Sequence, residues 1–163
     1  MSYAIIRNAK YTMNNLNVIF RHNERKNTNY SNKDINKINS IKNYSIKSCN
    51  VPYSKRFNEI KRQCHLKGQI KKTSNVVCEY IITSDKEFFE EIGEAETKRY
   101  FETAHKFVCS YKDLGEQYII SSKVHMDEKT PHLHLVFIPV VHTKDKKTNK
   151  SIDKISCTEF WKG

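Results

Sequence analysis

The chain has 163 residues, which is enough for one domain with a buried core and too few for two domains of ordinary size. It carries 29 Lys and Arg against 18 Asp and Glu, a net charge of +11, and 37% of its residues are hydrophobic. No apolar run approaches the roughly 20 residues that a membrane-spanning helix needs, and the apolar stretch at the N-terminus is too short for a secretion signal. Its five cysteines lack C-x-x-C spacing, as expected of free thiols in a reducing compartment. We therefore expect a single cytoplasmic domain, residues 1–163.

The positive charge is concentrated in the first part of the chain. Residues 1–72 hold 16 Lys and Arg and 3 Asp and Glu, whereas residues 73–116 hold 5 and 10, and residues 117–163 hold 8 and 5. A basic region of this kind either solvates the protein or binds a polyanion. The Asn and Tyr residues interleaved with it favour nucleic acid, because rings stack on unpaired bases and amides bind base edges. The mixture fits single strands better than duplex.

The hydrophobic pattern is weak in the first half of the chain. Residues 2–6 read as a short strand and residues 16–20 as a second apolar stretch. Residues 21–51 are polar and rich in Asn and Ser, which predicts a long loop region able to wrap a ligand. Residues 54–62 have the serine start and the basic face of a surface helix, and Gly68 is its expected end.

The second half has clearer elements. Residues 76–83 are a β-branched run typical of a buried strand. Asp85 then caps a helix that begins near Lys86, Gly93 interrupts it, and residues 96–111 form a second helix with apolar residues at i, i+3 and i+4. Residues 118–125 and 132–140 are the last two strong strands, and the six residues between them suit a hairpin loop. The pattern predicts an α+β fold, an antiparallel sheet with helices packed on one face.

Two histidines alternate with a leucine in the last of these strands. Because successive side chains of a strand point to opposite faces, His132 and His134 share one face and Leu133 takes the other. If the preceding strand pairs with it antiparallel through the loop, His125 lies directly across and adds a third nitrogen. Three imidazoles with coordination positions left open are typical of a catalytic metal centre, whereas structural sites are usually closed by four ligands.

A lone His-x-His on a strand is more often a packed or exposed pair than a metal site. The full run of residues 125–134, His-Met-Asp-Glu-Lys-Thr-Pro-His-Leu-His, favours the metal site instead. Asp127 and Glu128 add carboxylates beside the ion, where one can orient a ligand or act as a general base.

This run, His-x-Asp-Glu-x-Thr-Pro-His-x-His, resembles the metal motif of the Mob/Pre family of plasmid mobilization relaxases, the MobV type of HUH endonuclease. Residues 22–25, His-Asn-Glu-Arg, resemble the family's first motif, His-x-x-Arg, and residues 29–35, 43–44 and 83–89 also fit its pattern. The resemblance extends from Ser2 to about Phe160. It implies a HUH relaxase-like fold and a site-specific endonuclease and strand transferase, which nicks one strand of plasmid DNA at an origin of transfer.

The resemblance also implies a mechanism. His125, His132 and His134 would bind a divalent metal, manganese or magnesium, which polarises the scissile phosphate. His22 matches the histidine thought to be the nucleophile of the family. Attack by its neutral ring would leave the protein joined to the 5′ phosphate as a phosphoramidate.

Further roles follow from the same resemblance and from the basic loop. Glu128 is the candidate to take or hold the imidazole proton, and Arg25 is the candidate phosphate clamp, since its planar fork suits two oxygens. The other candidate DNA-binding residues are Lys26, Tyr30, Asn32 and Tyr44. Tyr44 is also the rival nucleophile, and it ranks behind His22 because a tyrosine in a basic loop is more often a base-stacking residue.

The remaining histidines are not expected in the site. His65 and His105 lie in helical regions, where a satisfied or solvent-facing ring is the default. His142 has the parity of His134 but lies eight residues beyond it, which at about 3.3 Å per residue is far from the ion.

Members of the family usually continue into helices that dimerise or aid DNA binding, whereas this chain stops at Gly163. We therefore expect a C-terminally shortened relaxase domain, with a homodimer only where a C-terminal region is present. Two alternatives remain open. A truncated, non-catalytic DNA-binding remnant would bind DNA with steep salt dependence and nick nothing. A rolling-circle replication initiator would use a tyrosine as its nucleophile.

Overall fold

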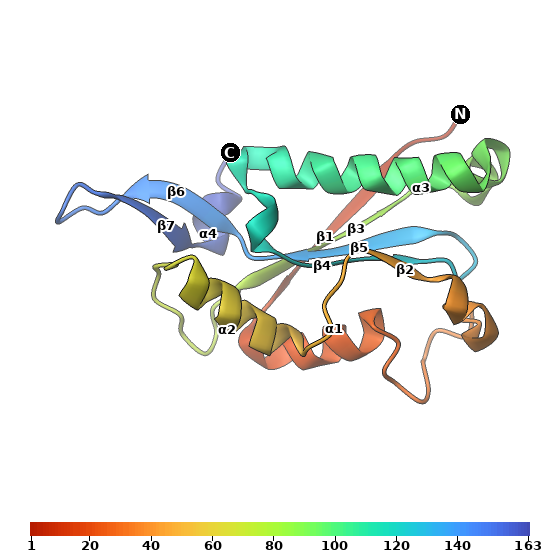
Figure 1. Ribbon diagram of the computed structural model, residues 1–163, viewed down its shortest axis with the longest axis horizontal. Helices are drawn as coiled ribbons and strands as arrows, with labels where there is room; N and C mark the ends of the chain where they lie inside the picture. The colour runs from red at the N-terminus through yellow and green to blue at the C-terminus, as the bar shows by residue number, and fades with distance from the viewer.

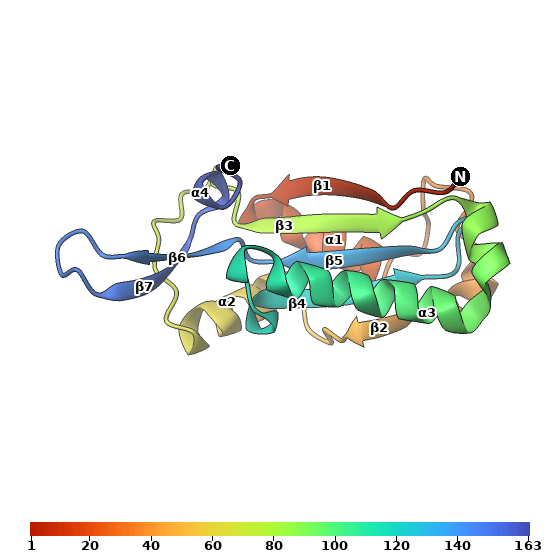
Figure 2. The same cartoon turned by 90° about the horizontal axis from the view of Figure 1, so that it is seen from above.

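A five-stranded antiparallel sheet runs through the centre of the computed structural model, which describes all of residues 1–163. Its order is β1-β3-β5-β4-β2, as Figure 2 shows from above. The strands are β1 Ile5–Tyr11, β2 Tyr44–Lys47, β3 Val77–Thr83, β4 Ile119–His125 and β5 His132–Phe137. All neighbouring strands are antiparallel. The central strand β5 carries two of the candidate metal ligands, so these are held from both sides.

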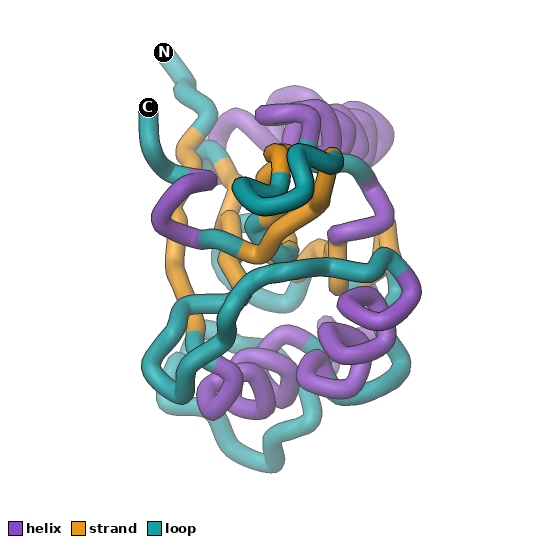
Figure 3. The backbone as a smooth tube through the Cα atoms, turned by 90° about the vertical axis from the view of Figure 1, so that its left-hand side faces the viewer, coloured by secondary structure: helices purple, strands orange, loops and turns teal.

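Helices cover both faces of the sheet (Figures 1 and 3). The long helix α3, Lys86–Ser110, crosses one face, and α1, Leu16–Asn23, packs with α2, Tyr53–Gln63, on the other. The expected α+β class and antiparallel sheet are confirmed, but the helices lie on two faces and not on one. The reason is that β3, β4 and β5 are buried along nearly their whole length, and a sheet buried on both faces needs cover on both.

Alternation along β5 divides its side chains between the two layers. Leu135 is paired with Ser122, whose hydroxyl is hydrogen-bonded to His105 of α3. The odd-numbered side chains of β5 therefore face α3. His134 is paired with Lys123, whose ammonium group is ion-paired with Glu24 at the end of α1. The α3 side therefore holds a largely apolar core, which includes Leu133, Leu135, Phe137, Phe101 and Val108, and the α1 side holds the histidines.

The N-terminal elements differ most from the expectations. The apolar stretch of residues 16–20 is part of α1, in which Leu16 and Ile19 are buried one turn apart. The first strand begins at Ile5 and continues to Tyr11. The expected loop of residues 21–51 contains the end of α1, a 3-10 helix over Lys37–Lys42 and the edge strand β2.

Gly68 does not end the second helix, because α2 ends at Gln63 with Cys64 as its C-cap. Gly68 instead lies against β7, Ser151–Ile155, with a φ of +118°. A Cβ atom at this position would come within 2.7 Å of the carbonyl oxygen of Ile155. The glycine therefore allows two backbones to approach each other closely.

The helix α3 agrees with the sequence pattern. The carboxylate of Asp85 accepts a hydrogen bond of 2.9 Å from the backbone N–H of Phe88, which caps the first turn. Gly93 has φ 78° and ψ 179°, so the helix is interrupted where the sequence predicts. Three further 3-10 turns are Met13–Asn15, Tyr111–Asp113 and Glu116–Tyr118.

Beyond β5 the chain forms a two-stranded hairpin that the sequence pattern did not predict. β6, Val140–Lys144, pairs with β7, and the hairpin projects away from the main sheet (Figure 1). Its residues are mostly polar and partly exposed, which hides the alternation of a buried strand. The short helix α4, Cys157–Phe160, then returns to the core, where the ring of Phe160 lies 5.6 Å from that of Phe137. None of the helices has the length and apolar character needed to span a membrane.

Candidate metal centre and active site

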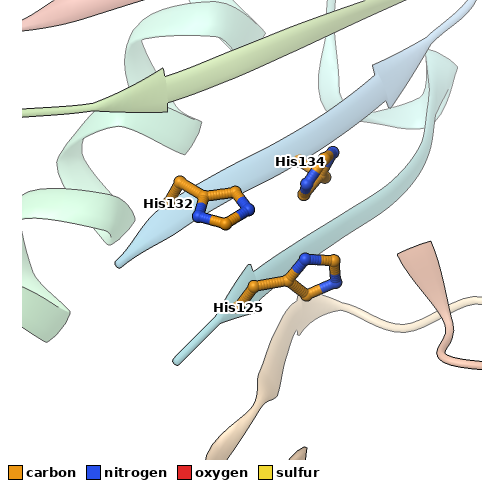
Figure 4. Close-up of side chains that lie close together, drawn as sticks. All are labelled: His125, His132 and His134. Carbon is orange, nitrogen blue, oxygen red and sulfur yellow. The ribbon is translucent and has the colours of Figure 1, made fainter. Parts of the chain in front are cut away.

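The β4–β5 hairpin brings three histidines together (Figure 4). His125 is paired directly with His132, and His134 lies two residues further along the same face. The ring centroids are 5.3 Å apart for His125 and His132, 4.9 Å for His132 and His134, and 4.5 Å for His125 and His134. One nitrogen of each ring lies within 4.8 Å of the others. The strand alternation and the hairpin pairing expected from the sequence are both present.

Each of the three rings has one nitrogen held by a hydrogen-bond acceptor. Nε2 of His125 lies 2.7 Å from the carbonyl oxygen of Asn23. Nδ1 of His132 lies 2.9 Å from the carbonyl oxygen of Thr130, and Nδ1 of His134 lies 3.2 Å from the carboxylate of Glu79. Because an acceptor requires the proton on the nitrogen that faces it, the other nitrogen of each ring is the one available to a metal.

The available nitrogens fit a divalent cation. Nδ1 of His125 and Nε2 of His134 are buried and have no hydrogen-bond partner, although a buried polar atom is normally satisfied. Nε2 of His132 lies 2.8 Å from the carboxylate of Glu128, so this carboxylate borders the position that an ion would take. Three imidazole nitrogens beside a carboxylate suit manganese, zinc, cobalt or nickel.

Glu79 is a site residue that the sequence analysis did not identify. Its side chain in β3 is 3% exposed, and its Oε2 accepts hydrogen bonds from Nδ1 of His134 at 3.2 Å and from Nδ2 of Asn23 at 2.6 Å. Burial opposes its charge, but these bonds, together with one from Tyr11, lower the pKa of the Glu79 carboxyl. The available signal was a charged residue inside the apolar run of residues 76–83, since a buried carboxylate needs partners.

The helix α1 places His22 beside the three histidines. The centroid of its ring lies 5.8 Å from that of His134, 6.2 Å from that of His125 and 6.0 Å from that of Tyr30. Burial and the positive charge of Arg25 lower the pKa of His22, so the ring is neutral at pH 7 and keeps a lone pair. A neutral imidazole at the edge of a metal site has the properties of a nucleophile.

Arg25 connects α1 to the hairpin that carries the ligands. Its Nε and Nη2 donate to the two carboxylate oxygens of Asp127 at 2.8 and 2.7 Å, and Nη2 lies 3.0 Å from Glu128. Arg25 has a φ of +53°, a left-handed conformation that costs a non-glycine residue about 1–2 kcal/mol. The two ion pairs offset this strain. The guanidinium is therefore committed to two carboxylates, which favours a clamp between segments over the expected clamp on a phosphate.

Asp127 also fixes the loop between α1 and β2. It accepts hydrogen bonds from the hydroxyl of Ser40 at 2.6 Å and from the side-chain amide of Asn43 at 2.9 Å, and its own carbonyl accepts from the backbone N–H of Asn36 at 2.7 Å. Burial works against its charge, but the bonds from Arg25 and these side chains hold the pKa of the Asp127 carboxyl far below its usual range. Hydrogen bonds to Asp127 therefore fix the polar segment between α1 and β2 in place.

Glu128 lies with the ligand nitrogens and does not contact the ring of His22. One carboxylate oxygen is 2.8 Å from Nε2 of His132 and 3.7 Å from Nδ1 of His125, and the other accepts a bond of 2.5 Å from the amide of Asn32. Despite burial, these partners hold the pKa of the Glu128 carboxyl far below its usual range, which makes it a weak proton acceptor. The geometry favours a further metal ligand over the expected base for His22.

The candidate DNA-binding residues lie in two places. Tyr30 and Asn32 are at the site, and the ring of Tyr30 lies 5.4 Å from the guanidinium of Arg25, while Lys26 is exposed nearby. Tyr44 is paired with Val124, which points toward α3, so Tyr44 is on the opposite face of the sheet from the histidines. Burial raises the pKa of Tyr44 to about 12. Its position places its hydroxyl on the side of the sheet away from the three histidines, which favours His22 over Tyr44 as the nucleophile of this centre.

The other histidines stay outside the cluster, as expected. His105 is buried on the sheet-facing side of α3 against Ser122, and His142 is bonded to Asp153 in the β6–β7 hairpin. His65 is exposed after α2.

The chain matches a known protein family along most of its length. A model of that family, described as plasmid recombination enzyme, matches residues 1–158. The chain belongs to the Mob/Pre plasmid recombination enzyme family. A plasmid recombination enzyme of Lactiplantibacillus plantarum is 41% identical over 141 residues, and one of Streptococcus agalactiae is 37% identical over 147 residues. These alignments cover 85% and 88% of this chain, and 38% and 29% of the relatives, so the chain spans about a third of their length.

Solved structures give the same fold. The relaxase domain of MobM, bound to manganese and to oriT DNA of 22 nucleotides, superposes with a TM-score of 0.81 and 33% identity, over 98% of this chain and 77% of that one. A second manganese-bound crystal structure of that domain, with 22-nucleotide oriT DNA at pH 5.5, gives a TM-score of 0.80 and 32% identity over the same shares of the two chains. The fold is therefore that of a Mob/Pre relaxase domain, as the resemblance of the motifs predicted.

Proposed function

We propose that this domain is a metal-dependent DNA relaxase, which nicks one strand of plasmid DNA at an origin of transfer and transfers or rejoins it. The observation that carries the proposal is the neutral ring of His22 beside three histidines whose free nitrogens converge. Membership of the Mob/Pre family, and likeness to a relaxase solved with oriT DNA and manganese, support the substrate and the ion. Plasmid DNA as substrate implies action in the bacterial cytoplasm.

The metal ligands in this proposal are His125, His132 and His134, with Glu128 beside them. Manganese is the preferred candidate for the ion, and magnesium is the second candidate. When bound, it polarises the scissile phosphate and takes up charge in the transition state. Glu79 holds the ring of His134 in the tautomer that the site needs.

His22 supplies the nucleophile. A ring nitrogen attacks the phosphorus, and the bond from phosphorus to the 3′ oxygen breaks as the nitrogen–phosphorus bond forms. The second ring nitrogen then loses its proton to solvent, and the 3′ oxygen gains one. The products are a free 3′ hydroxyl and a 5′ phosphate joined to His22 as a phosphoramidate. The reverse attack by a 3′ hydroxyl restores the strand, because the covalent bond conserves the energy of the phosphodiester.

The residues around His22 suit an unpaired strand. The ring of Tyr30 can stack on a base, and the amide of Asn32 can bind a base edge. The exposed Lys26 can contact the phosphate backbone with its positive charge. In this proposal Arg25 acts through Asp127, by holding α1 and the following loop against the hairpin.

The test is a nicking assay on supercoiled plasmid that carries the protein's own upstream region, with manganese or with a chelator. We expect open circles only with the metal, with the 5′ end attached to protein, and no adduct with His22→Ala. Tight, salt-sensitive binding without nicking would contradict the proposal and identify a non-catalytic DNA-binding remnant.

A further inference from the structure

Asn23 contacts one candidate metal ligand directly and the hydrogen-bond partner of a second. It is the last residue of α1, follows His22 directly, and is 1% exposed. Its side-chain Nδ2 donates a hydrogen bond of 2.6 Å to Oε2 of Glu79, the same oxygen that accepts from His134. Its main-chain carbonyl accepts a bond of 2.7 Å from Nε2 of His125. One residue therefore joins the helix of the nucleophile to the metal centre by two independent bonds.

The buried stripe of α1 makes this residue type unexpected. Leu16, Ile19 and Asn23 follow the spacing i, i+3 and i+7, and all three are buried, so a core-facing helix would carry an apolar residue at position 23. A buried amide costs stability unless it is hydrogen-bonded. Here the amide is satisfied by a buried carboxylate, which in turn needs the amide as one of its donors. The pair can form in only one rotational setting of the helix, because neighbouring residues of a helix are about 100° apart.

We propose that Asn23 is a positioning residue, which sets the register of α1 against the metal centre and thereby orients both the ligand histidines and the ring of His22. This inference rests on the proposed function of the site. Asn23 touches neither substrate nor metal and acts through Glu79 and His125. Loss of its amide leaves the main-chain bond in place, so the variant Asn23→Ala removes only one of the two connections.

The first test measures manganese binding without DNA. Asn23→Ala is compared with wild type and with Asn17→Ala, an exposed asparagine of the same helix. Free manganese is followed by electron paramagnetic resonance, and Tm is measured with and without the ion. We expect Asn23→Ala to bind manganese about 10-fold more weakly, the usual scale for a partner of a metal ligand, and to show a smaller rise in Tm on adding the ion. Asn17→Ala should match wild type.

A purely structural role would give a different pattern. If Asn23→Ala lowers Tm equally with and without manganese and keeps the wild-type affinity, Asn23 only stabilises the fold and the proposal is overturned. A double-mutant cycle with Glu79→Gln adds a second criterion. If Asn23 acts through Glu79, the double variant binds manganese no more weakly than Glu79→Gln alone, whereas additive losses would contradict that route.

The second test separates the orientation of His22 from metal affinity. At manganese concentrations that saturate each variant, Asn23→Ala should nick about 10²-fold more slowly than wild type, since a displacement of about 1 Å has that effect on a reacting group. DNA affinity should not change. A wild-type rate at saturation would overturn the role in orienting His22. Absence of nicking in the wild type would instead overturn the proposed function, and the manganese affinities would still decide whether Asn23 organises the metal centre.

Discussion

The two faces of the central sheet are built on different principles. On the side of α3, Leu133 and Leu135 are fully buried in an apolar and aromatic layer. On the side of α1, His132 and His134 lie among carboxylates, amides and a guanidinium. Residues one position apart in the same strand therefore serve either the core or the chemistry. This separation lets a substitution remove one property while it leaves the other in place.

The stability of the face toward α1 comes from complete hydrogen bonding of its polar groups and not from burial of apolar area. Asp127 and Glu79 are buried, and each accepts from three side chains. Removing one donor leaves a buried charge that is only partly compensated, which costs about 1–3 kcal/mol. The face that carries the candidate active site is for this reason sensitive to single polar substitutions, whereas the α3 face is sensitive to loss of volume.

The sharpest way to separate the faces is His22→Ala. We expect nicking to fall by about 10⁴-fold or more, because the variant lacks the nitrogen that attacks phosphorus in the proposed mechanism. Manganese affinity and Tm should stay close to wild type, since His22 is not among the converging ligands. Nicking rates, covalent adducts on gels and thermal melts check this. An adduct that persists in the variant would show that another residue is the nucleophile.

The next effect is that of His132→Ala, which removes one of the three ligands. We expect manganese affinity to fall by at least about 10²-fold and nicking to be abolished at ordinary manganese concentrations. DNA affinity should keep most of its salt dependence, because the basic residues remain. Calorimetric titration with manganese and DNA binding at several salt concentrations test these points. Retained cutting would count against the metal site.

The matched substitution on the other face is Leu133→Ala. Leu133 is fully buried, so its truncation should lower the free energy of unfolding by about 3 kcal/mol, within the usual range for Leu→Ala in a core. Manganese affinity of the folded protein should change less than about twofold if the faces are independent. Urea denaturation and metal titration provide the two values. A large loss of metal affinity at full folding would mean that the two faces are coupled through β5.

A smaller effect concerns the pH dependence of the ion-free protein. Burial lowers the pKa of His125 from 6.5 to about 4. In the window between these values the unfolded chain binds a proton that the folded chain does not, so stability is lost as the pH falls from about 6.5 to about 4. Melting in chelator over this range should show the fall in wild type and a shallower one in His125→Gln. If Tm falls equally steeply with pH in both proteins, His125 is not the cause of the pH dependence.

The smallest expected effect is that of Tyr44→Phe. The hydroxyl of Tyr44 is buried without a hydrogen-bond partner and points to the α3 face, so its removal leaves no group unsatisfied. Nicking should remain within about twofold of wild type, and Tm should change little. If Tyr44→Phe were to reduce nicking more than His22→Ala does, a tyrosine mechanism of the replication-initiator type would replace the present proposal.

Patterns within one segment were sufficient for much of the site. The spacing of His132 and His134, the loop length that places His125 opposite them, the cap at Asp85 and the break at Gly93 all follow from local rules, and the structure contains each of them. Strand alternation and helix capping act over a few residues, so the sequence carries them without knowledge of the rest of the chain.

The remaining features depend on segments that are far apart in the chain. The contact of Asn23 with Glu79, the ion pair of Arg25 with Asp127 and the side of the sheet taken by Tyr44 are all decided by the packing of α1 and β2 against the central strands. Residues 16–20 became a helix because a second face of the sheet needed cover, which a short apolar stretch does not reveal. The sequence by itself determined which side chains could bind a metal. The tertiary structure decided which nitrogens are free and what lies beside them, since hydrogen bonds between distant segments form only when those segments pack together.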